Sequence, residues 1–209
     1  METPNQTTAP TIMNNSDLSS LVKQMRIKCL KDNTHILERI KSETTLTGKC
    51  ILARNYLAPQ SNIMEQIIKK DLEIGNAPDK SSGDGSKNGK NFEIKFSAHD
   101  KNGKFNWVQF RPDHNIDYYI LIGYNLFEGT LGKAYNFKVP AEDLYQLIID
   151  YGGYAHGCQD ILGVPTKDNL KGRDCEYAIR VNPNVLVNKS KELWDKLQTY
   201  ITPYHKDQY

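Results

Sequence analysis

The sequence predicts an α/β (α+β) fold in which helices flank a central mixed β-sheet. Residues 118–124 are almost continuously apolar or aromatic, as expected of a central strand that is covered on both faces. Residues 61–74 and 141–151 repeat apolar side chains at helical spacing. An Asn-Gly dipeptide at positions 88–89 is typical of the tight turn of a β-hairpin.

The N-terminal part of the chain differs in composition from the rest. Residues 1–16 are polar and offer nothing to bury, so we expect a disordered tail there. Apolar residues at helical spacing predict a helix over 17–31 and a shorter one over 34–41. The length of the chain, 209 residues, predicts a single domain over 17–209, with these helices as an N-terminal extension.

The later elements are predicted from periodicity and from helix and strand breakers. Gly75 is expected to end the helix that begins near Ser61, and Pro140 is expected to end a strand. In chain order the sequence predicts a helix over 61–74, hairpin strands that end at 87 and start at 90, strands over 104–110, 118–124 and 134–139, a helix over 141–151, a strand over 176–181 and a final helix that Ser190 caps.

The hairpin over 82–97 carries two acids and a lysine in a defined register. Because Asn88 and Gly89 both tolerate positive φ, a two-residue turn at this point fixes which residues face each other. In that register Asp84 falls opposite Glu93, and the two-residue period of a strand places Lys95 on the same face as Glu93. Two carboxylates and an ammonium are therefore expected to converge.

This convergence predicts a divalent metal site. Facing carboxylates repel each other unless a cation lies between them. Carboxylate oxygens of Asp84 and Glu93 with the main-chain carbonyl of Ile94 suit Mg²⁺, and Mn²⁺ is expected to substitute. Lys95 would then lie beside a metal-bound water that attacks phosphorus. The alternative is a solvated hairpin whose charges have no catalytic role.

The stretch resembles the PD-(D/E)xK nuclease superfamily, and within it the type II restriction endonucleases. The resemblance covers about 60 residues, from the helix near Glu65 to the strand that ends near Gly123. It implies a restriction-endonuclease-like αβββαβ core, metal ligands at Asp84 and Glu93, and a lysine, Lys95, that positions or activates the attacking water. A Pro-Asp dipeptide is present at 78–79, but Asp79 does not fit the hairpin register and is the weaker candidate ligand.

Two further residues are candidates for the catalytic site. Relatives often carry a carboxylate on the helix before the metal hairpin, and Glu65 matches that position; the alternative is a capping box between Asn62 and Glu65. Gln109 is expected on the same strand face as Phe105 and Trp107, where it would reach the metal-bound water or DNA. The alternative for Gln109 is a hydrogen bond on the sheet face.

Side chains that suit contacts with DNA gather in the hairpin and in a long Gly-rich segment, 152–174. Lysine and arginine bind phosphates, whereas Gln, Asn and Arg read purine edges. An ordinary hydrophilic loop is the alternative. The candidates are Lys87 and Lys90 in the hairpin, Arg111 after the strand predicted over 104–110, and His156, Gln159, Lys167, Asn169, Lys171 and Arg173 in the long segment.

The resemblance implies a Mg²⁺-dependent, sequence-specific endonuclease of type II restriction kind that cleaves double-stranded DNA. Such enzymes are commonly homodimers, because a two-fold symmetric site suits a two-fold symmetric reader. A structure-specific repair or recombination nuclease and a catalytically inactive DNA-binding module are the alternatives. A net charge of +2 means that any affinity for DNA depends on local patches. The sequence lacks a secretory signal and a membrane-spanning apolar run, so we expect a cytoplasmic protein without a membrane partner.

Overall fold

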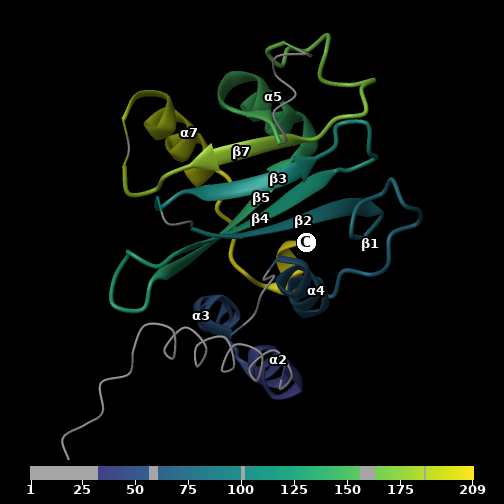
Figure 1. Cartoon of the computed structure of the whole chain (residues 1–209). Helices are drawn as coiled ribbons and strands as arrows, with labels where there is room; N and C mark the ends of the chain where they lie inside the picture. Colours follow the sequence, from purple (N-terminus) through teal and green to yellow (C-terminus); the bar gives the residue numbers. More distant parts are fainter. Residues whose placement is uncertain (1–32, 57–60, 100–101, 156–162, 186) are drawn as a thin grey trace, which may run out of the picture.

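The structure is a computed structural model that describes residues 33–56, 61–99, 102–155, 163–185 and 187–209. The predicted tail over 1–16 and the predicted helix over 17–31 lie outside these ranges. Five α-helices and two β-sheets make up the described part (Figure 1), which confirms a mixed α/β class. In chain order the elements are α2 (Asn33–Ser42), α3 (Leu46–Tyr56), α4 (Ser61–Asp71), β1 (Gly85–Lys87), β2 (Lys90–Ala98), β3 (Phe105–Phe110), β4 (Tyr118–Asn125), β5 (Lys133–Pro140), α5 (Ala141–Tyr151), β6 (Gly153–Tyr154), β7 (Tyr177–Val181), α7 (Asn188–Gln198) and a short 3-10 turn, η1 (Lys206–Gln208). None of the described helices is long and apolar enough to cross a membrane.

The larger sheet is mixed and has the strand order β1-β2-β4-β5. Strands β2 and β4 are parallel, and the other two pairs are antiparallel. Strand β4 is buried along its length apart from Tyr118, which confirms the central strand that its apolar run predicts. Parallel neighbours need a crossover connection, and here the chain crosses through β3 on its way from β2 to β4.

The prediction of one sheet is wrong for β3 and β7. These strands form a second, antiparallel sheet of order β3-β7-β6. A side chain at Gly123 of β4 would approach the ring of Phe105 to 2.9 Å, so the glycine lets β3 stack over the mixed sheet. The arrangement is therefore two stacked sheets with helices, rather than one sheet between helices.

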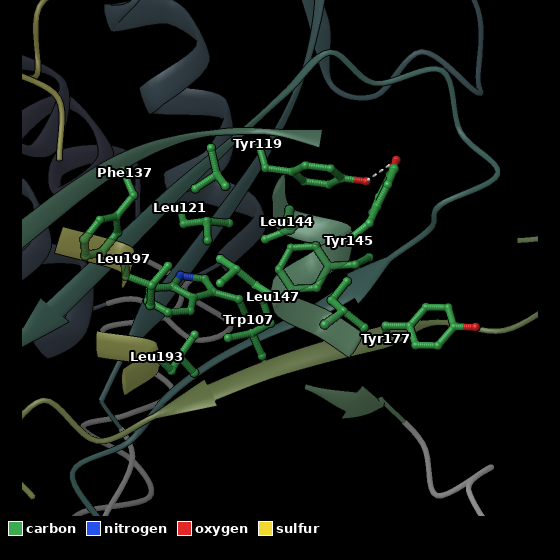
Figure 2. Packing of buried hydrophobic residues seen from close by; sticks show 14 of the residues in the cluster. Trp107, Tyr119, Leu121, Phe137, Leu144, Tyr145, Leu147, Tyr177, Leu193 and Leu197 are labelled. Carbon is green, nitrogen blue, oxygen red and sulfur yellow. Dashed lines mark hydrogen bonds between the residues drawn. The ribbon is translucent and has the colours of Figure 1, made fainter. Parts of the chain in front are cut away.

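The mixed sheet separates two hydrophobic cores. Alternate residues of β4 serve the two cores, with Tyr119 and Leu121 on one face and Ile120 and Ile122 on the other. The first core lies between the sheets and includes α5 and α7, with the ring of Trp107 near its centre (Figure 2). The second core packs α2, α3 and α4 against the opposite face (Figure 1). Because β1 is short, it pairs with only the first part of β2. The rest of that edge of β2 carries the candidate site.

Several element boundaries differ from the prediction. Helix α4 ends at Asp71 because Glu73 takes a left-handed conformation, with φ of 55°, while Gly75 donates its amide to the Ser86 carbonyl at 2.9 Å. Helix α7 begins two residues before Ser190. Helix α3 was not predicted; its start is marked by Thr45, whose hydroxyl accepts the Gly48 amide at 3.1 Å.

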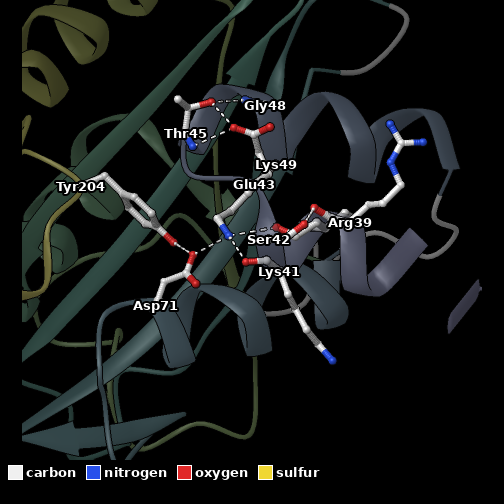
Figure 3. A network of polar contacts seen from close by, with 10 residues as sticks. Arg39, Lys41, Ser42, Glu43, Thr45, Gly48, Lys49, Asp71 and Tyr204 are labelled. Atoms are coloured by element: carbon white, nitrogen blue, oxygen red, sulfur yellow. Dashed lines mark hydrogen bonds and ion pairs between the residues drawn. The ribbon is translucent and has the colours of Figure 1, made fainter. Parts of the chain in front are cut away.

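A buried lysine connects α2, α3, α4 and the C-terminal segment, residues 199–209, which follows α7 (Figure 3). The side chain of Lys49 is 3% exposed and donates to the Ile40 carbonyl at 2.9 Å, at the end of α2. Its ammonium also lies 3.2 Å from a carboxylate oxygen of Asp71, which accepts the hydroxyl of Tyr204 at 2.7 Å. The helical layer is thus held together by a charge that is both paired and hydrogen-bonded.

We expect Asp71→Ala to destabilise the fold by about 3 kcal/mol or more, because it leaves the buried ammonium of Lys49 without its carboxylate. Tyr204→Phe is the matched control, since it removes only one hydrogen bond and is expected to cost about 1 kcal/mol. Urea denaturation of both variants measures the two free energies. Equal losses would mean that the ion pair does not stabilise this layer.

Candidate active site

The hairpin of β1 and β2 has the register that its turn predicts. Asn88 and Gly89 have φ angles of 54° and 73°, as a type I′ turn requires. Lys87 pairs with Lys90, and Gly85 pairs with Phe92. The turn chemistry therefore predicts the hairpin correctly up to Gly85.

Asp84 lies just before β1 and leaves the regular ladder. Its amide donates to the Phe92 carbonyl at 2.9 Å, and its carboxylate Oδ2 accepts the Ile94 amide at 2.7 Å. Because β1 is short, it offers no main-chain partner to the Ile94 amide, and the Asp84 carboxylate accepts this hydrogen bond instead. The expected one-to-one pairing of Asp84 with Glu93 is thus replaced by a side-chain contact along the β2 edge.

Glu93 and Lys95 lie on one face of β2, as the strand period predicts. The Lys95 ammonium is 2.5 Å from Oε1 of Glu93, and the two side chains are only 12% and 16% exposed, respectively. Burial is the main cause that raises the pKa of Glu93 above its usual range, and Lys95 opposes this shift. The charge of Asp84 raises the pKa of Glu93 further, so the three predicted side chains share one electrostatic environment.

Glu65 approaches the same edge of β2 from α4. Its Oε1 accepts the Phe96 amide at 3.4 Å. Because α4 already includes Ser61, Asn62 lies within the helix, which disfavours the capping box. Burial raises the pKa of Glu65 to about 7; Lys95 lowers this pKa, whereas Asp84 and Glu93 raise it. Glu65 therefore belongs electrostatically to the same group.

The acids of this site offer oxygen ligands of the type that a hard divalent cation prefers. The carboxylates of Glu65 and Glu93 interact with the ammonium of Lys95, and the pKa values of both are raised, mainly by burial and further by the charge of Asp84. The Ile94 carbonyl points to the same side of β2 as its amide, which contacts Asp84. Within the described residues, however, no group of three or more His, Cys, Asp or Glu side chains is arranged so that it could hold a metal ion.

Gln109 does not lie where alternation predicts. The pairing of β3 with β7 shifts between Trp107 and Phe110, and Gln109 sits in this bulge with a φ of 63°. Its side chain is exposed, whereas Phe105 and Trp107 are buried. The expectation that the three residues share a face is wrong, because the bulge reverses the alternation.

Asp79 has a local structural role. Its Oδ1 accepts the amide of Ser81 at 2.8 Å and the hydroxyls of Ser81 and Ser82 at 2.7 and 3.0 Å. This is the hydrogen bonding of an Asx turn. Of the two aspartates considered as ligands, Asp84 is the one that contacts the β2 edge.

The lysines of the hairpin contact other parts of the protein. Lys87 donates to the carbonyls of Leu72 and Lys206 at 2.8 and 2.6 Å, and it therefore ties the hairpin to the C-terminal segment. Lys90 pairs with Asp117 at 2.8 Å while its side chain stays 53% exposed. Contact of either lysine with DNA remains a prediction.

The candidates in the long segment fall into separate places. Lys167 and Lys171 line a cavity of about 310 Å³ beside α5. The Asn169 side chain contacts the main chain of Val164 and Thr166 at 2.8 and 2.7 Å and so shapes its own turn. His156 and Gln159 lie outside the described residues.

A larger cavity, of about 710 Å³, brings Arg111 together with Arg173. Arg111 pairs with Glu176, which lies 65 residues further along the chain. His114 lines the same cavity, and its electrostatic interaction with Glu93 lowers the pKa of that carboxyl. Sequence reasoning missed His114; its position in the loop between two predicted strands was the available signal.

We expect Glu65→Gln to change how stability depends on pH. The pKa of Glu65 rises from 4.5 to about 7 on folding, so the folded state holds a proton that the unfolded state releases between these values. The stabilisation of the folded state that comes from this proton is fully present below pH 4.5 and is lost as the pH rises through about 7. Glutamine keeps an acceptor for the Phe96 amide, so the variant should be more stable than the wild type at pH 8, by up to about 3 kcal/mol.

Urea denaturation in EDTA at pH 5 and pH 8 measures this effect. Between pH 5 and pH 8 the free energy of unfolding should fall more for the wild type than for Glu65→Gln. Parallel losses would show that the Glu65 carboxyl is not buried in the folded state.

A comparison of the chain with protein-family models, with curated proteins and with solved structures found no match.

Proposed function

We propose that this protein is a Mg²⁺-dependent endonuclease of the PD-(D/E)xK kind that hydrolyses phosphodiester bonds in double-stranded DNA at specific sequences, as type II restriction enzymes do. The observation that carries the proposal is the close pair of Lys95 and Glu93, 2.5 Å apart and largely buried, with Asp84 beside it on the β2 edge. A buried ion pair costs desolvation, so excess acids around it need a functional reason.

The acids are the residues that would hold the metal. Asp84 and Glu93 supply carboxylate oxygens, the Ile94 carbonyl supplies a third oxygen, and Glu65 approaches from α4. A bound Mg²⁺ lowers the pKa of its water and stabilises negative charge on the phosphate. The raised pKa values of Glu65 and Glu93 favour a cation there, because a cation removes the repulsion among the acids.

Lys95 is assigned the role of orienting the attacking water and the phosphate. An ammonium has three donors and no acceptor, so next to Glu93 it donates hydrogen bonds. One donor is engaged by the carboxylate, and this contact fixes the direction of the others. The salt bridge thus prepares Lys95 to stabilise charge that develops on the phosphate.

The proposal includes the partners that the resemblance to restriction endonucleases implies. Double-stranded DNA is the substrate, Mn²⁺ replaces Mg²⁺, and two copies of the chain act as a homodimer on a palindromic site. A repair or recombination nuclease on the same site would instead prefer branched or damaged DNA.

Incubation of the purified protein with a plasmid of known sequence, in Mg²⁺ and in EDTA, tests the proposal. Discrete fragments in Mg²⁺ and none in EDTA are expected. A smear would replace the restriction enzyme by a nonspecific nuclease. Uncut plasmid, together with binding that persists in EDTA, would reject hydrolysis and favour a DNA-binding module.

A further inference from the structure

Lys69 on α4 reaches across to the residue that immediately precedes β1. Its Nζ donates a hydrogen bond to the main-chain carbonyl of Asp84 at 2.7 Å and a longer one to the side chain of Asn76 at 3.3 Å. The pairing of β1 with β2 begins only at Gly85, so the carbonyl of Asp84 lies outside that ladder. Lys69 therefore supplies a donor to a main-chain acceptor that the regular strand pairing does not reach.

Asp84 is held through all of its polar groups. Its amide donates to the Phe92 carbonyl at 2.9 Å, and its carboxylate Oδ2 accepts the Ile94 amide at 2.7 Å. These two contacts come from β2, whereas the contact of the carbonyl comes from Lys69 on the helix. Because the carbonyl and the side chain share one Cα atom, a contact that fixes the carbonyl also limits where the carboxylate can point.

The same helix carries the acid that approaches the β2 edge. Glu65 precedes Lys69 by four residues on α4, so the two side chains lie on one face of that helix. Glu65 accepts the Phe96 amide at 3.4 Å, while Lys69 holds Asp84. The contact of Lys69 thus fixes how α4 and the hairpin sit relative to each other, and with them the two acids that they carry.

An ammonium near a group of acids has two opposite effects on a cation that binds there. Its charge repels the cation, and its hydrogen bond orients a ligand for the cation. Removal of the Lys69 ammonium would strengthen cation binding if the repulsion were its main effect. Removal would weaken cation binding if Lys69 mainly holds Asp84 in place. The direction of the change therefore separates the two roles.

We propose that Lys69 is a positioning residue that, through the main-chain carbonyl of Asp84, holds the Asp84 carboxylate in the direction that the metal site on the β2 edge requires. Lys69 is assigned no direct contact with the metal or with DNA, so its effect reaches them only through Asp84. The inference rests on the proposed function, because Asp84 is a metal ligand of the proposed nuclease.

Titration with Mn²⁺, followed by electron paramagnetic resonance without DNA, tests this role. Lys69→Met keeps the unbranched side chain without its ammonium and should weaken Mn²⁺ binding by about 10- to 100-fold, as the loss of a residue that orients a ligand does. Lys69→Arg keeps a donor and should recover most of that loss. Lys70→Met, at the exposed neighbour on α4, is the charge-matched control and should bind as the wild type does. Unchanged or tighter binding in Lys69→Met would overturn the inference.

Hydrogen exchange of the Ile94 amide, measured by NMR in EDTA, tests the same contact without metal or cleavage. In Lys69→Met this amide should exchange about 10-fold faster, the factor that corresponds to one lost hydrogen bond. The amide of Ile122, in the central strand β4, should keep its rate. Unchanged exchange at Ile94, or equal acceleration at both amides from a general loss of stability, would reject the positioning role.

The two measurements also separate this inference from the proposed function. If the wild type leaves plasmid uncut in Mg²⁺ while Lys69→Met accelerates exchange at Ile94 alone and weakens Mn²⁺ binding, the role of Lys69 stands and hydrolysis is rejected. If the wild type cleaves plasmid while Lys69→Met changes neither Ile94 exchange nor Mn²⁺ binding, the nuclease stands and the role of Lys69 is rejected.

Discussion

Asp84→Asn and Lys95→Ala are each expected to reduce DNA cleavage by about 100-fold or more while the fold is retained. An asparagine side chain keeps an oxygen that accepts the Ile94 amide, so Asp84→Asn removes the negative charge without opening the hairpin edge. Lys95→Ala removes the donor next to Glu93. Initial rates of plasmid cleavage in Mg²⁺, together with thermal melts, measure both effects.

Asp79→Asn is the matched control for this prediction. Asp79 is the aspartate of the Pro-Asp dipeptide, but it is exposed and its carboxylate caps the turn at Ser81 and Ser82. The Asp79→Asn variant should therefore retain cleavage. If Asp79→Asn loses activity and Asp84→Asn retains it, the ligand has been assigned to the wrong aspartate.

Gly85→Ala is expected to lower both stability and cleavage. A Cβ atom at this position would lie 2.1 Å from the Gly75 carbonyl oxygen and 2.7 Å from a methyl carbon of Ile74. The main chain must move to relieve this clash, and overpacking of this kind costs about 1–3 kcal/mol. Because Asp84 directly precedes Gly85, the displacement should also move its carboxylate away from the Ile94 amide.

Gly153→Ala is the control for Gly85→Ala, because a Cβ atom at Gly153 meets no atom within 4 Å. It should change stability by less than about 0.5 kcal/mol and leave cleavage unchanged. Urea denaturation and cleavage rates compare the two variants. A Gly85→Ala protein with wild-type stability and activity would show that the close approach of Gly75 does not position Asp84.

The hairpin and its charges were predictable because the information is local. The Asn-Gly turn fixes the pairing of Lys87 with Lys90, and the strand period then places Glu93 and Lys95 together. The sequence did not predict that Asp84 leaves the ladder. Nor does the local sequence indicate that Gly75 approaches Gly85 from outside the hairpin.

Features that depend on distant contacts were beyond sequence reasoning. The bulge at Gln109 arises where β3 pairs with β7, and the second sheet depends on the stacking of Phe105 over Gly123. The cavity around Arg173 is closed by contacts between segments more than 50 residues apart. Arg111 and Arg173 were named as DNA contacts, but their shared cavity with carboxylates emerges only from the fold.

Contacts of the C-terminal segment give a further example. Asn88 at the hairpin turn donates to the main chain of Tyr209 at 3.1 Å, and the ring of Tyr209 packs against Phe92. Nothing in the local pattern of the last residues indicates this contact. The segment nevertheless supports the hairpin that carries the candidate active site.

Binding of Mn²⁺, followed by electron paramagnetic resonance in the absence of DNA, tests the central claim most directly. The wild type should bind the ion at a site that Mg²⁺ competes for, and both Asp84→Asn and Glu93→Gln should weaken this binding strongly, while Asp79→Asn should not. Binding that is equal in all four proteins, or absent from the wild type both alone and with DNA, would contradict a metal-dependent site on this hairpin.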